Sequence, residues 1–179
     1  MVCVTAARRS WLASVVLGLV VVLCAERASA QASPINLALF NPIQLVPETA
    51  SIHGLRLNIY GKNRDMHGLD FGFIHEATGN LVGIEFGLVN WVHRDAVGIQ
   101  VGLMSQVGGH LIGGQLNWLS LAGSIEGAQI GLLNHAERVD GLQFGLVNIA
   151  DQLRGLQLGL VNIALNGFLP VFVLFNFAF

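Results

Sequence analysis

The sequence predicts an all-β domain built from short repeats, and two observations support this prediction. An eight-residue unit, G-φ-Q-φ-G-φ-φ-N with φ an apolar residue, recurs at steps of fourteen or fifteen along most of the chain. Within each unit, apolar residues alternate with Gly, Gln and Gly, and a period of two is typical of a strand with two unlike faces. A helical period does not fit the units, so we expect one strand in each of them.

The first thirty residues differ from the repeats and have the features of a secretory signal peptide. Arg8 and Arg9 form a positive region, residues 11–23 an apolar run, and residues 28–30 an A-x-A cleavage site. The apolar run is short for a transmembrane helix, which needs about 20 residues. We therefore expect removal of residues 1–30 on export. Lipidation at Cys24 or an uncleaved anchor is the alternative.

The remaining chain, residues 31–179, is expected to form one repeat-built β domain. Both cysteines lie in the first thirty residues, so the domain must be stable without disulfides. That segment also holds three of the nine Lys and Arg residues and one of the eleven Asp and Glu residues, which leaves a net charge of about −4. No basic patch remains for nucleic acid, and we expect no nucleic-acid partner.

Ten copies of the unit account for nearly all of the domain. Two degenerate copies, at 34–41 and 169–176, flank eight copies that begin with Gly. An Asn closes many copies, as is common where a strand ends in a turn, and the stretches between copies carry most of the charge. The units depart from the pattern at Gly114, Asn117 and Ala128, where we expect weaker strand continuity. The eight complete copies begin at Gly54, Gly68, Gly83, Gly98, Gly113, Gly127, Gly141 and Gly155.

The fold we expect is a ten-stranded antiparallel up-and-down barrel. Ten is an even number, as bacterial single-chain outer-membrane barrels require. At the C-terminus Phe175, Phe177 and Phe179 alternate with other residues, and this ending resembles the terminal strand by which such barrels are recognised for assembly. In a barrel the Leu side of each strand would face lipid and the Gly and Gln side a lumen.

The alternative fold is a parallel β-solenoid with one repeat in each coil. It explains the uniform connections and places Asn over Asn and Gln over Gln in ladders. Its difficulty is an outward apolar stripe that includes Val147 and Ile149, together with an apolar last coil. The two folds differ in one feature: Asn148 and Asn162 are neighbours in a solenoid and lie at opposite ends of an antiparallel barrel.

One polar position of the unit forms the candidate functional column, either a lumen lining or a ladder. Three successive copies place opposite charges there, and we expect ion pairing between them in preference to acid–base catalysis by the two carboxylates. The later copies place Gln there. The column consists of Arg56, Asp70, Glu85, Gln100, Gln115, Gln129, Gln143 and Gln157.

Units such as GIEFGLVN, GLQFGLVN and GLQLGLVN, preceded by LRLNIYGKN and closed by NGFLPVFVLFNF, carry a family resemblance. They resemble the short surface repeat of exported proteins of spirochaetes and other Gram-negative bacteria. The resemblance covers residues 34–179. It implies a surface or outer-membrane location, and it brings no catalytic or binding residue with it.

The residues of ordinary enzyme chemistry form no recognisable motif. Six histidines are scattered among turns and strand ends without metal-ligand spacing. Ser105 and His110, near two Gly-Gly pairs, suggest a hydrolase, but a flexible turn explains the same residues better. The glycines do not form a phosphate-binding loop. We expect no enzyme activity, no cofactor and no metal.

Two function classes remain open from the sequence. The first is a non-enzymatic outer-membrane barrel with a structural role or a narrow conduit, whose partners are outer-membrane lipid and the barrel-assembly machinery. The second is a secreted or surface-displayed solenoid that serves as a binding or adhesion scaffold. Both are exported through the inner membrane. The first is then located in the outer membrane or at the cell surface, and the second in the periplasm or outside the cell.

Overall fold

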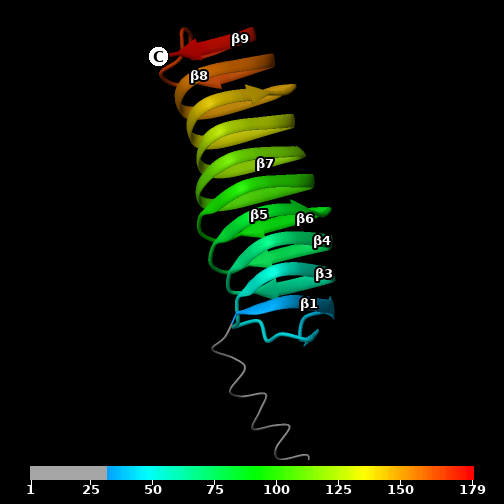
Figure 1. The fold of residues 1–179 in the computed structure, drawn as a ribbon. Helices are drawn as coiled ribbons and strands as arrows, with labels where there is room; N and C mark the ends of the chain where they lie inside the picture. The colour runs from blue at the N-terminus through cyan, green and yellow to red at the C-terminus, as the bar shows by residue number, and fades with distance from the viewer. Residues whose placement is uncertain (1–31) are drawn as a thin grey trace, which may run out of the picture. The chain divides into compact units, whose positions relative to one another are not determined.

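In the computed structural model, which describes residues 32–179, the repeats form a parallel β-solenoid of about eight turns (Figure 1). The expected signal peptide lies outside the described residues. Within residues 32–179 the chain forms no helix that is long and apolar enough to cross a membrane. The strands are β1 (Ser33–Phe40), β2 (Ile43–Gln44), β3 (Ile52–Asn63), β4 (Met66–Ala77), β5 (Leu81–Phe86), β6 (Val89–Val92), β7 (Ala96–Phe144), β8 (Val147–Ala164) and β9 (Val171–Ala178).

Neighbouring coils pair in parallel, with each residue opposite its equivalent in the next repeat. Gly54 lies opposite Gly68 between β3 and β4, and Asn134 lies opposite Asn148 between β7 and β8. The sheet order is β2-β1-β3-β4-β5-β7-β8-β9, and β6 pairs with β4 and β7. Only the end strands are antiparallel among the described residues: β2 on β1, and β9 on β8. Each coil is one repeat long, so equivalent positions of successive repeats stack in columns.

The expected antiparallel barrel is therefore wrong, and the solenoid alternative is confirmed. A barrel needs antiparallel neighbours and a seam where the first and last strands meet. Here β1 and β9 lie at opposite ends of the sheet order. Asn148 and Asn162 are neighbours, because the Asn148 Nδ2 donates a hydrogen bond to the Asn162 Oδ1 at 2.8 Å. The repeat is long enough for the chain to turn back within one coil.

The chain turns at glycines. All eight glycines that begin the complete copies have positive φ, between 128° and 152°. A second bend lies near the fifth position of the unit, which is Gly in six complete copies and Asn in two, at Asn58 and Asn117. In two coils it interrupts the strand: between β5, which ends at Phe86, and β6, which begins at Val89, and between β7 and β8. The departures at Gly114, Asn117 and Ala128 do not weaken the strand, because β7 runs through them without a break.

The interior consists of four stacked columns of inward side chains. Two are polar, the Gln column and the Asn column, and two are mainly apolar and form the hydrophobic core. One apolar column contains Ala77, Val92, Val107, Ala122, Ala136, Ala150 and Ala164. The other contains Ile52, Met66, Leu81, Ala96, Leu111, Ile125, Val139 and Leu153. Two of the four interior columns thus stabilise the stack mainly by apolar burial, and the other two by hydrogen bonds between coils.

Candidate functional site

The five glutamines of the candidate column form a continuous ladder inside the solenoid. Each side-chain amide donates to the side-chain oxygen of the preceding coil, and all five side chains are fully buried. Four of them also donate to a backbone carbonyl six residues later, as Gln143 does to Ile149 at 3.1 Å. The ladder bonds are Gln115 to Gln100 at 3.0 Å, Gln129 to Gln115 at 2.9 Å, Gln143 to Gln129 at 2.7 Å and Gln157 to Gln143 at 2.7 Å.

The ladder ends at a buried ionic cluster in the first coils. The Gln100 Nε2 donates to the Glu85 Oε2 at 2.8 Å, so the donor end of the ladder faces a carboxyl group. Arg56 from β3 donates through its Nε to the Asp70 Oδ2 at 2.9 Å, and its Nη2 also contacts that oxygen. The Arg56 Nη2 lies 4.0 Å from the Glu85 Oε1. Arg56 and Asp70 thus form an ion pair inside the core, and Glu85 lies beside it.

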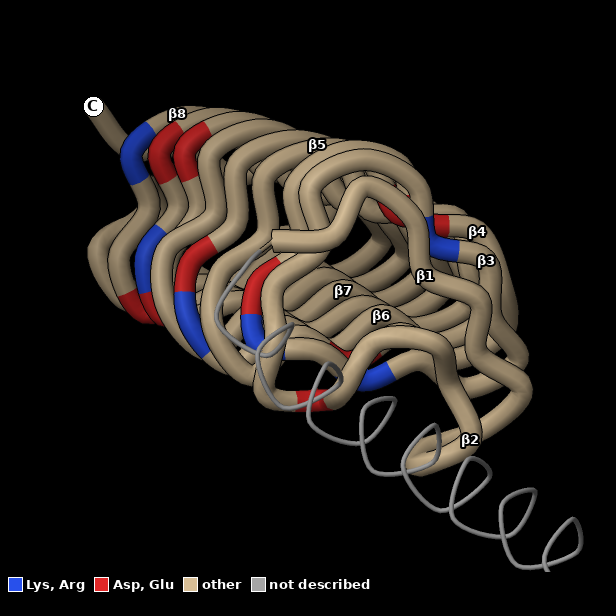
Figure 2. Tube along the Cα trace, turned by 60° about the horizontal axis from the view of Figure 1, so that its bottom comes forward, with Lys and Arg blue, Asp and Glu red and all other residues tan. Residues whose placement is uncertain are grey.

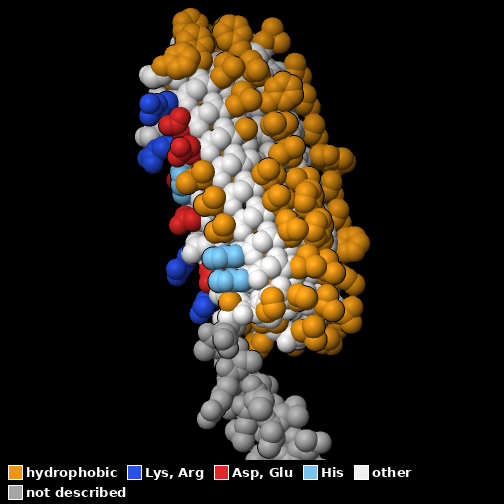
Figure 3. Space-filling view, in the orientation of Figure 1, with side chains coloured by type: hydrophobic (Ala, Val, Ile, Leu, Met, Phe, Trp, Pro, Cys, Tyr) orange, Lys and Arg blue, Asp and Glu red, His pale blue; other side chains and the backbone are white. Residues whose placement is uncertain are grey.

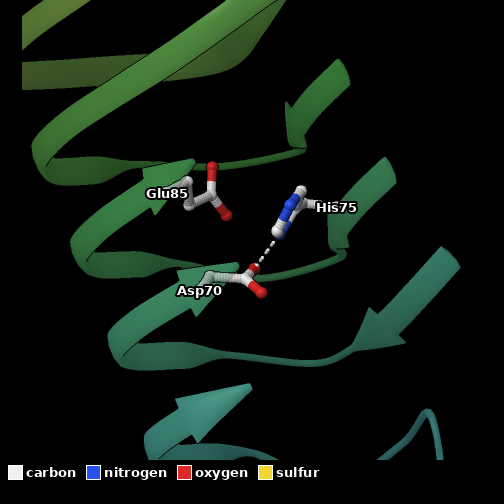
Figure 4. A group of neighbouring side chains, drawn as sticks. All are labelled: Asp70, His75 and Glu85. Atoms are coloured by element: carbon white, nitrogen blue, oxygen red, sulfur yellow. Dashed lines mark ion pairs between the residues drawn. The ribbon is translucent and has the colours of Figure 1, made fainter. Parts of the chain in front are cut away.

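Two residues that the sequence did not assign to the column complete this cluster. His75 comes from the Asn column, and its Nδ1 lies 2.5 Å from the Asp70 Oδ2 (Figure 4). The Asn58 Nδ2 donates to the Asp70 Oδ1 at 2.8 Å. The signal for His75 was present in the sequence, because it replaces Asn at the closing position of its unit. Asp70 and His75 both lie in β4, and only the bend within that coil, which the alternation does not predict, brings their side chains together.

The two carboxyl groups of the cluster have opposite pKa shifts. Burial raises the pKa of Asp70, but the charge of Arg56 and the hydrogen bonds from His75 and Arg56 outweigh it and hold that pKa below its ordinary value. For Glu85, burial and then the charge of Asp70 raise the pKa to about 7, against lowering contributions from Gln100, Arg56 and His75. Asp70 is therefore the partner of Arg56, and Glu85 holds its proton to near neutral pH.

The cluster contains a set of potential metal ligands but already has its cation. Ligand atoms of Asp70, His75 and Glu85 lie within 4.8 Å of one another, and all three residues are buried. Both oxygens of the Asp70 carboxylate already accept hydrogen bonds, the Oδ2 from Arg56 and the Oδ1 from Asn58. A divalent ion would have to displace Arg56 from a site with no exposed side chain. The arrangement fits an internal ion-pair network.

The Asn column is a second ladder, with donors that point the other way. The Asn134 Nδ2 donates to the Asn148 Oδ1 at 2.9 Å, and Asn148 donates in turn to Asn162. Where Ser105 and Ser120 replace Asn, the side chain of Asn117 turns inward. It accepts from the Ser105 Oγ at 2.9 Å and donates to the Ser120 Oγ at 3.3 Å. Asn117 thus links the two serines, and the chain of hydrogen bonds stops before Asn134, whose Oδ1 has no donor.

These columns fill the interior, and the expected lumen lining is not observed. Every residue of the candidate column, from Arg56 to Gln157, has an exposed fraction of 0%. The side chains bond to one another and to the backbone, so they offer a solute neither space nor free polar atoms along the ladder. Two atoms of this column are exceptions, because the Glu85 Oε1 and the Gln157 Oε1 have no hydrogen-bond partner. In the Asn column the His75 Nε2, the Asn90 Oδ1 and the Asn134 Oδ1 are also without a partner.

The Ser and His that suggested a hydrolase do not meet. Ser105 is buried and accepts from Asn90, whereas His110 lies on the turn side. The His110 Nδ1 is instead 2.7 Å from the Ser124 Oγ, and its Nε2 is 3.9 Å from the Glu126 Oε2. At that distance the largely exposed Glu126 does not fix the imidazole ring, so the group lacks an oriented base.

The outward side chains form an apolar ridge that the sequence did not locate. The ridge follows the second bend of each coil, and each of its residues is between 43% and 65% exposed. Figure 3 shows apolar side chains over most of one side of the molecule and charged side chains along one margin. The ridge consists of Ile59, Phe73, Leu88, Leu103, Trp118, Leu132, Leu146 and Leu160.

The C-terminal phenylalanines lie on the strand that covers the last coil. Strand β9 pairs with β8 in antiparallel orientation, and Phe177 stacks on Phe168 with ring centroids 5.3 Å apart. Phe175 is 42% exposed and Phe179 98%. These residues close the stack at one end, and their role in recognition for assembly stays a prediction.

Comparison of the chain with protein-family models, with curated proteins and with solved structures finds no match.

Proposed function

We propose that this protein is a non-enzymatic β-solenoid of the cell envelope, displayed at the surface or in the outer membrane, that binds a partner through its apolar ridge. The polar columns serve the fold, because their donors and acceptors are mostly paired with one another. The ridge, by contrast, is apolar and exposed in the described chain, so it is available to a partner.

The observation that carries this proposal is the length of the exposed apolar surface. Soluble monomers rarely expose contiguous apolar patches above a few hundred Å², and larger ones mark interaction sites. At a spacing of about 4.8 Å per coil, eight coils extend the ridge over roughly 34 Å. Together with the outward columns on either side, the ridge forms a larger continuous apolar surface than scattered exposed leucines would form.

The cell envelope is the location in which we expect this apolar surface to bind its partner. The expected signal peptide and the resemblance to surface repeats both support an envelope location. A periplasmic or secreted scaffold with a protein partner is the alternative. Assembly by the barrel machinery is no longer part of the proposal, because the parallel coils provide no barrel for it to close.

Fractionation of cells tests the proposal. We expect the chain to remain with the envelope pellet through washes at low and high salt. A ridge variant, Leu88→Gln, Leu132→Gln and Leu160→Gln, should move to the soluble fraction. A matched control, Leu45→Gln, Leu165→Gln and Leu169→Gln, changes three exposed leucines away from the ridge and should stay in the pellet. Retention of the folded ridge variant in the pellet would contradict the proposal.

A further inference from the structure

The ridge is the crest of a convex surface with no charge on it. In the coil of β5 and β6, Phe86 ends one sheet face and Val89 begins the next, with Leu88 exposed at the bend between them. Four outward columns over eight coils give thirty-two positions, and none of them is Asp, Glu, Lys or Arg. The columns begin at Leu55, Leu57, Ile59 and Tyr60 and end at Leu156, Leu158, Leu160 and Val161.

Most of the charges lie along another edge of the solenoid, in the residues that precede the leading glycines (Figure 2). Lys62 and Glu76 lie instead beyond the last outward column, where they pair at 3.4 Å. Arg64 is 62% exposed on its side chain and Arg154 77%, so the edge is in water from the first coil to the last. We call these residues the charged edge: Arg64, Asp65, Arg94, Asp95, Glu126, Glu137, Arg138, Asp140, Asp151 and Arg154.

The backbone beneath the ridge suits contact with hydrocarbon. In a lipid core an unpaired backbone N–H or C=O costs several kcal/mol, so only fully paired backbone enters it. Here the ladders between coils run parallel to the surface, and Ile74 pairs with Val89 as Val89 pairs with Met104. The pairing continues from coil to coil, so the convex face presents side chains and no free strand edge.

A second copy of this chain would cover the ridge and the columns beside it less completely than lipid chains would. Sheets that pack face to face are nearly flat and lie about 10 Å apart. A flat partner would cover one side of the bend and leave the other side and part of the crest in water. Lipid chains can cover both sides, because they adapt to a convex shape.

The charged edge fixes the orientation in a bilayer. If the solenoid axis crossed the membrane, the edge would run through a hydrocarbon core about 30 Å thick, at a cost of several kcal/mol for each charge. With the axis parallel to the membrane, the ridge is immersed while the edge stays in water. Interfacial amphipathic elements lie in this way, about 5–10 Å deep.

We propose that the solenoid lies flat on a lipid membrane with the ridge immersed in the hydrocarbon of one leaflet. This inference rests on the proposed function and names the partner as lipid. Because the ridge is uncharged, insertion needs no anionic headgroups, and salt leaves it unchanged.

A single tryptophan reports the depth of the ridge. The full chain with Trp11→Phe and Trp91→Phe keeps only Trp118, a ridge residue that is 65% exposed. On phosphatidylcholine vesicles we expect co-flotation, a blue shift of the Trp118 emission and quenching by bromine atoms on the acyl chains. The shift should be equal at low and high salt.

The ridge variant, made in the same background, should float at least tenfold less and keep its β-sheet circular dichroism, while the control leucine variant should float like the parent. Flotation without quenching of Trp118 would overturn the inference, because another part of the chain would then bind lipid. A blue shift without lipid, together with a doubled mass, would identify a second copy in its place.

The two proposals can fail separately. If vesicles do not bind but the ridge variant still leaves the envelope pellet, the lipid inference is wrong and the binding scaffold remains. If the ridge variant stays in the pellet, the scaffold proposal itself is wrong.

Discussion

Gly141 shows why each coil of the solenoid needs a glycine at its first corner. Its φ is 141°, a conformation that residues with a side chain rarely adopt. A Cβ on this residue would lie 2.0 Å from the carbonyl oxygen of Gly127 in the coil below. Both constraints recur in every complete copy, so the Gly at this position is dictated by the stacking of backbone on backbone.

Replacement of Gly141 by Ala should therefore destabilise the fold strongly. Strain at positive φ costs about 1–3 kcal/mol, and the clash with a fixed carbonyl adds to it. Gly114→Ala is the matched control, because its Cβ would meet Ala128 O at an ordinary 3.6 Å. Urea unfolding should show a loss of at least about 2 kcal/mol for Gly141→Ala. Equal midpoints for the two variants would contradict the corner geometry.

Glu85 makes the stability depend on pH near neutrality. Burial raises its pKa from 4.5 to about 7, so the folded chain holds this proton more tightly than the unfolded chain does. Its contribution to the free energy of unfolding is complete below pH 4.5 and is lost as the pH rises through 7. Asp70 acts in the opposite sense, below its ordinary pKa of 3.8, and does not interfere above pH 5.

We expect the urea midpoint of the parent to fall between pH 5.5 and pH 8, and that of Glu85→Gln to fall less. The groups that face Glu85 are Arg56 from β3, Asp70 and His75 from β4, and Gln100 from β7. A Gln here extends the ladder and carries no proton. Glu137→Gln, at an exposed position of β7, should keep the parental slope. An unchanged slope in Glu85→Gln would exclude Glu85 as its source.

The polar columns act as elements of the fold in the way that strands do. Each Gln of the ladder except Gln157 joins three coils, because it donates to the coil below and accepts from the coil above. A net hydrogen bond is worth about 1 kcal/mol, and a buried group left unpaired costs about 1–3 kcal/mol. The ladder therefore stabilises the parallel register more through the penalty for a misaligned coil than through the strength of each bond.

Substitution of one ladder residue tests this account of register. Gln143→Leu leaves the Gln129 oxygen without its donor and the Gln157 amide without its acceptor, so we expect a loss of about 2–5 kcal/mol. Gln152→Leu is the same change at an exposed position of β8, where the loss should be under about 1 kcal/mol. Equal losses in guanidinium unfolding would mean that the ladder has no special role.

Local patterns predict the strands of this protein but not whether successive strands pair in parallel or antiparallel orientation. Alternation of Leu with Gln and Gly predicts a strand whose apolar side faces away from the polar one, and this holds in both a barrel and a solenoid. The alternation carries no information on whether the next strand is parallel. The uniform connections favoured the coil, whereas the alternating phenylalanines that end in Phe179 favoured the barrel and in fact belong to the end strand β9.

Compensation between positions is equally hidden from the sequence. Asn117 breaks the Gly pattern of its unit. The sequence gives no sign that its side chain hydrogen-bonds to both Ser105 and Ser120, whose side chains are shorter than the Asn that they replace. Asn58 has a similar place beside Gly61, where it supports Asp70. Such pairs become visible only when the register brings two positions of one coil beside the same column.

On the scale of the whole molecule, the solenoid is an amphipathic body with polar ladders inside. The column residues could be named from the sequence, because one position of the unit carries them all. The ridge could not, because its exposure depends on a bend that divides one apparent strand into two faces. The apolar outer side, which counted against a solenoid in water, is the feature that the proposed lipid contact explains.

The most direct test of this account is whether residues one repeat apart touch. Asp140 and Arg154 are Cα partners in adjacent coils, and parallel neighbours about 4.8 Å apart fall within the range of a disulfide. In the full chain with Cys3→Ser and Cys24→Ser, Asp140→Cys with Arg154→Cys should form an intramolecular disulfide under mild oxidation, identified by mass spectrometry of the folded monomer. Asp140→Cys with Asp151→Cys, offset by three residues to about 10 Å, should not. Absence of the first cross-link, or formation of both with equal ease, would contradict the stack of parallel coils.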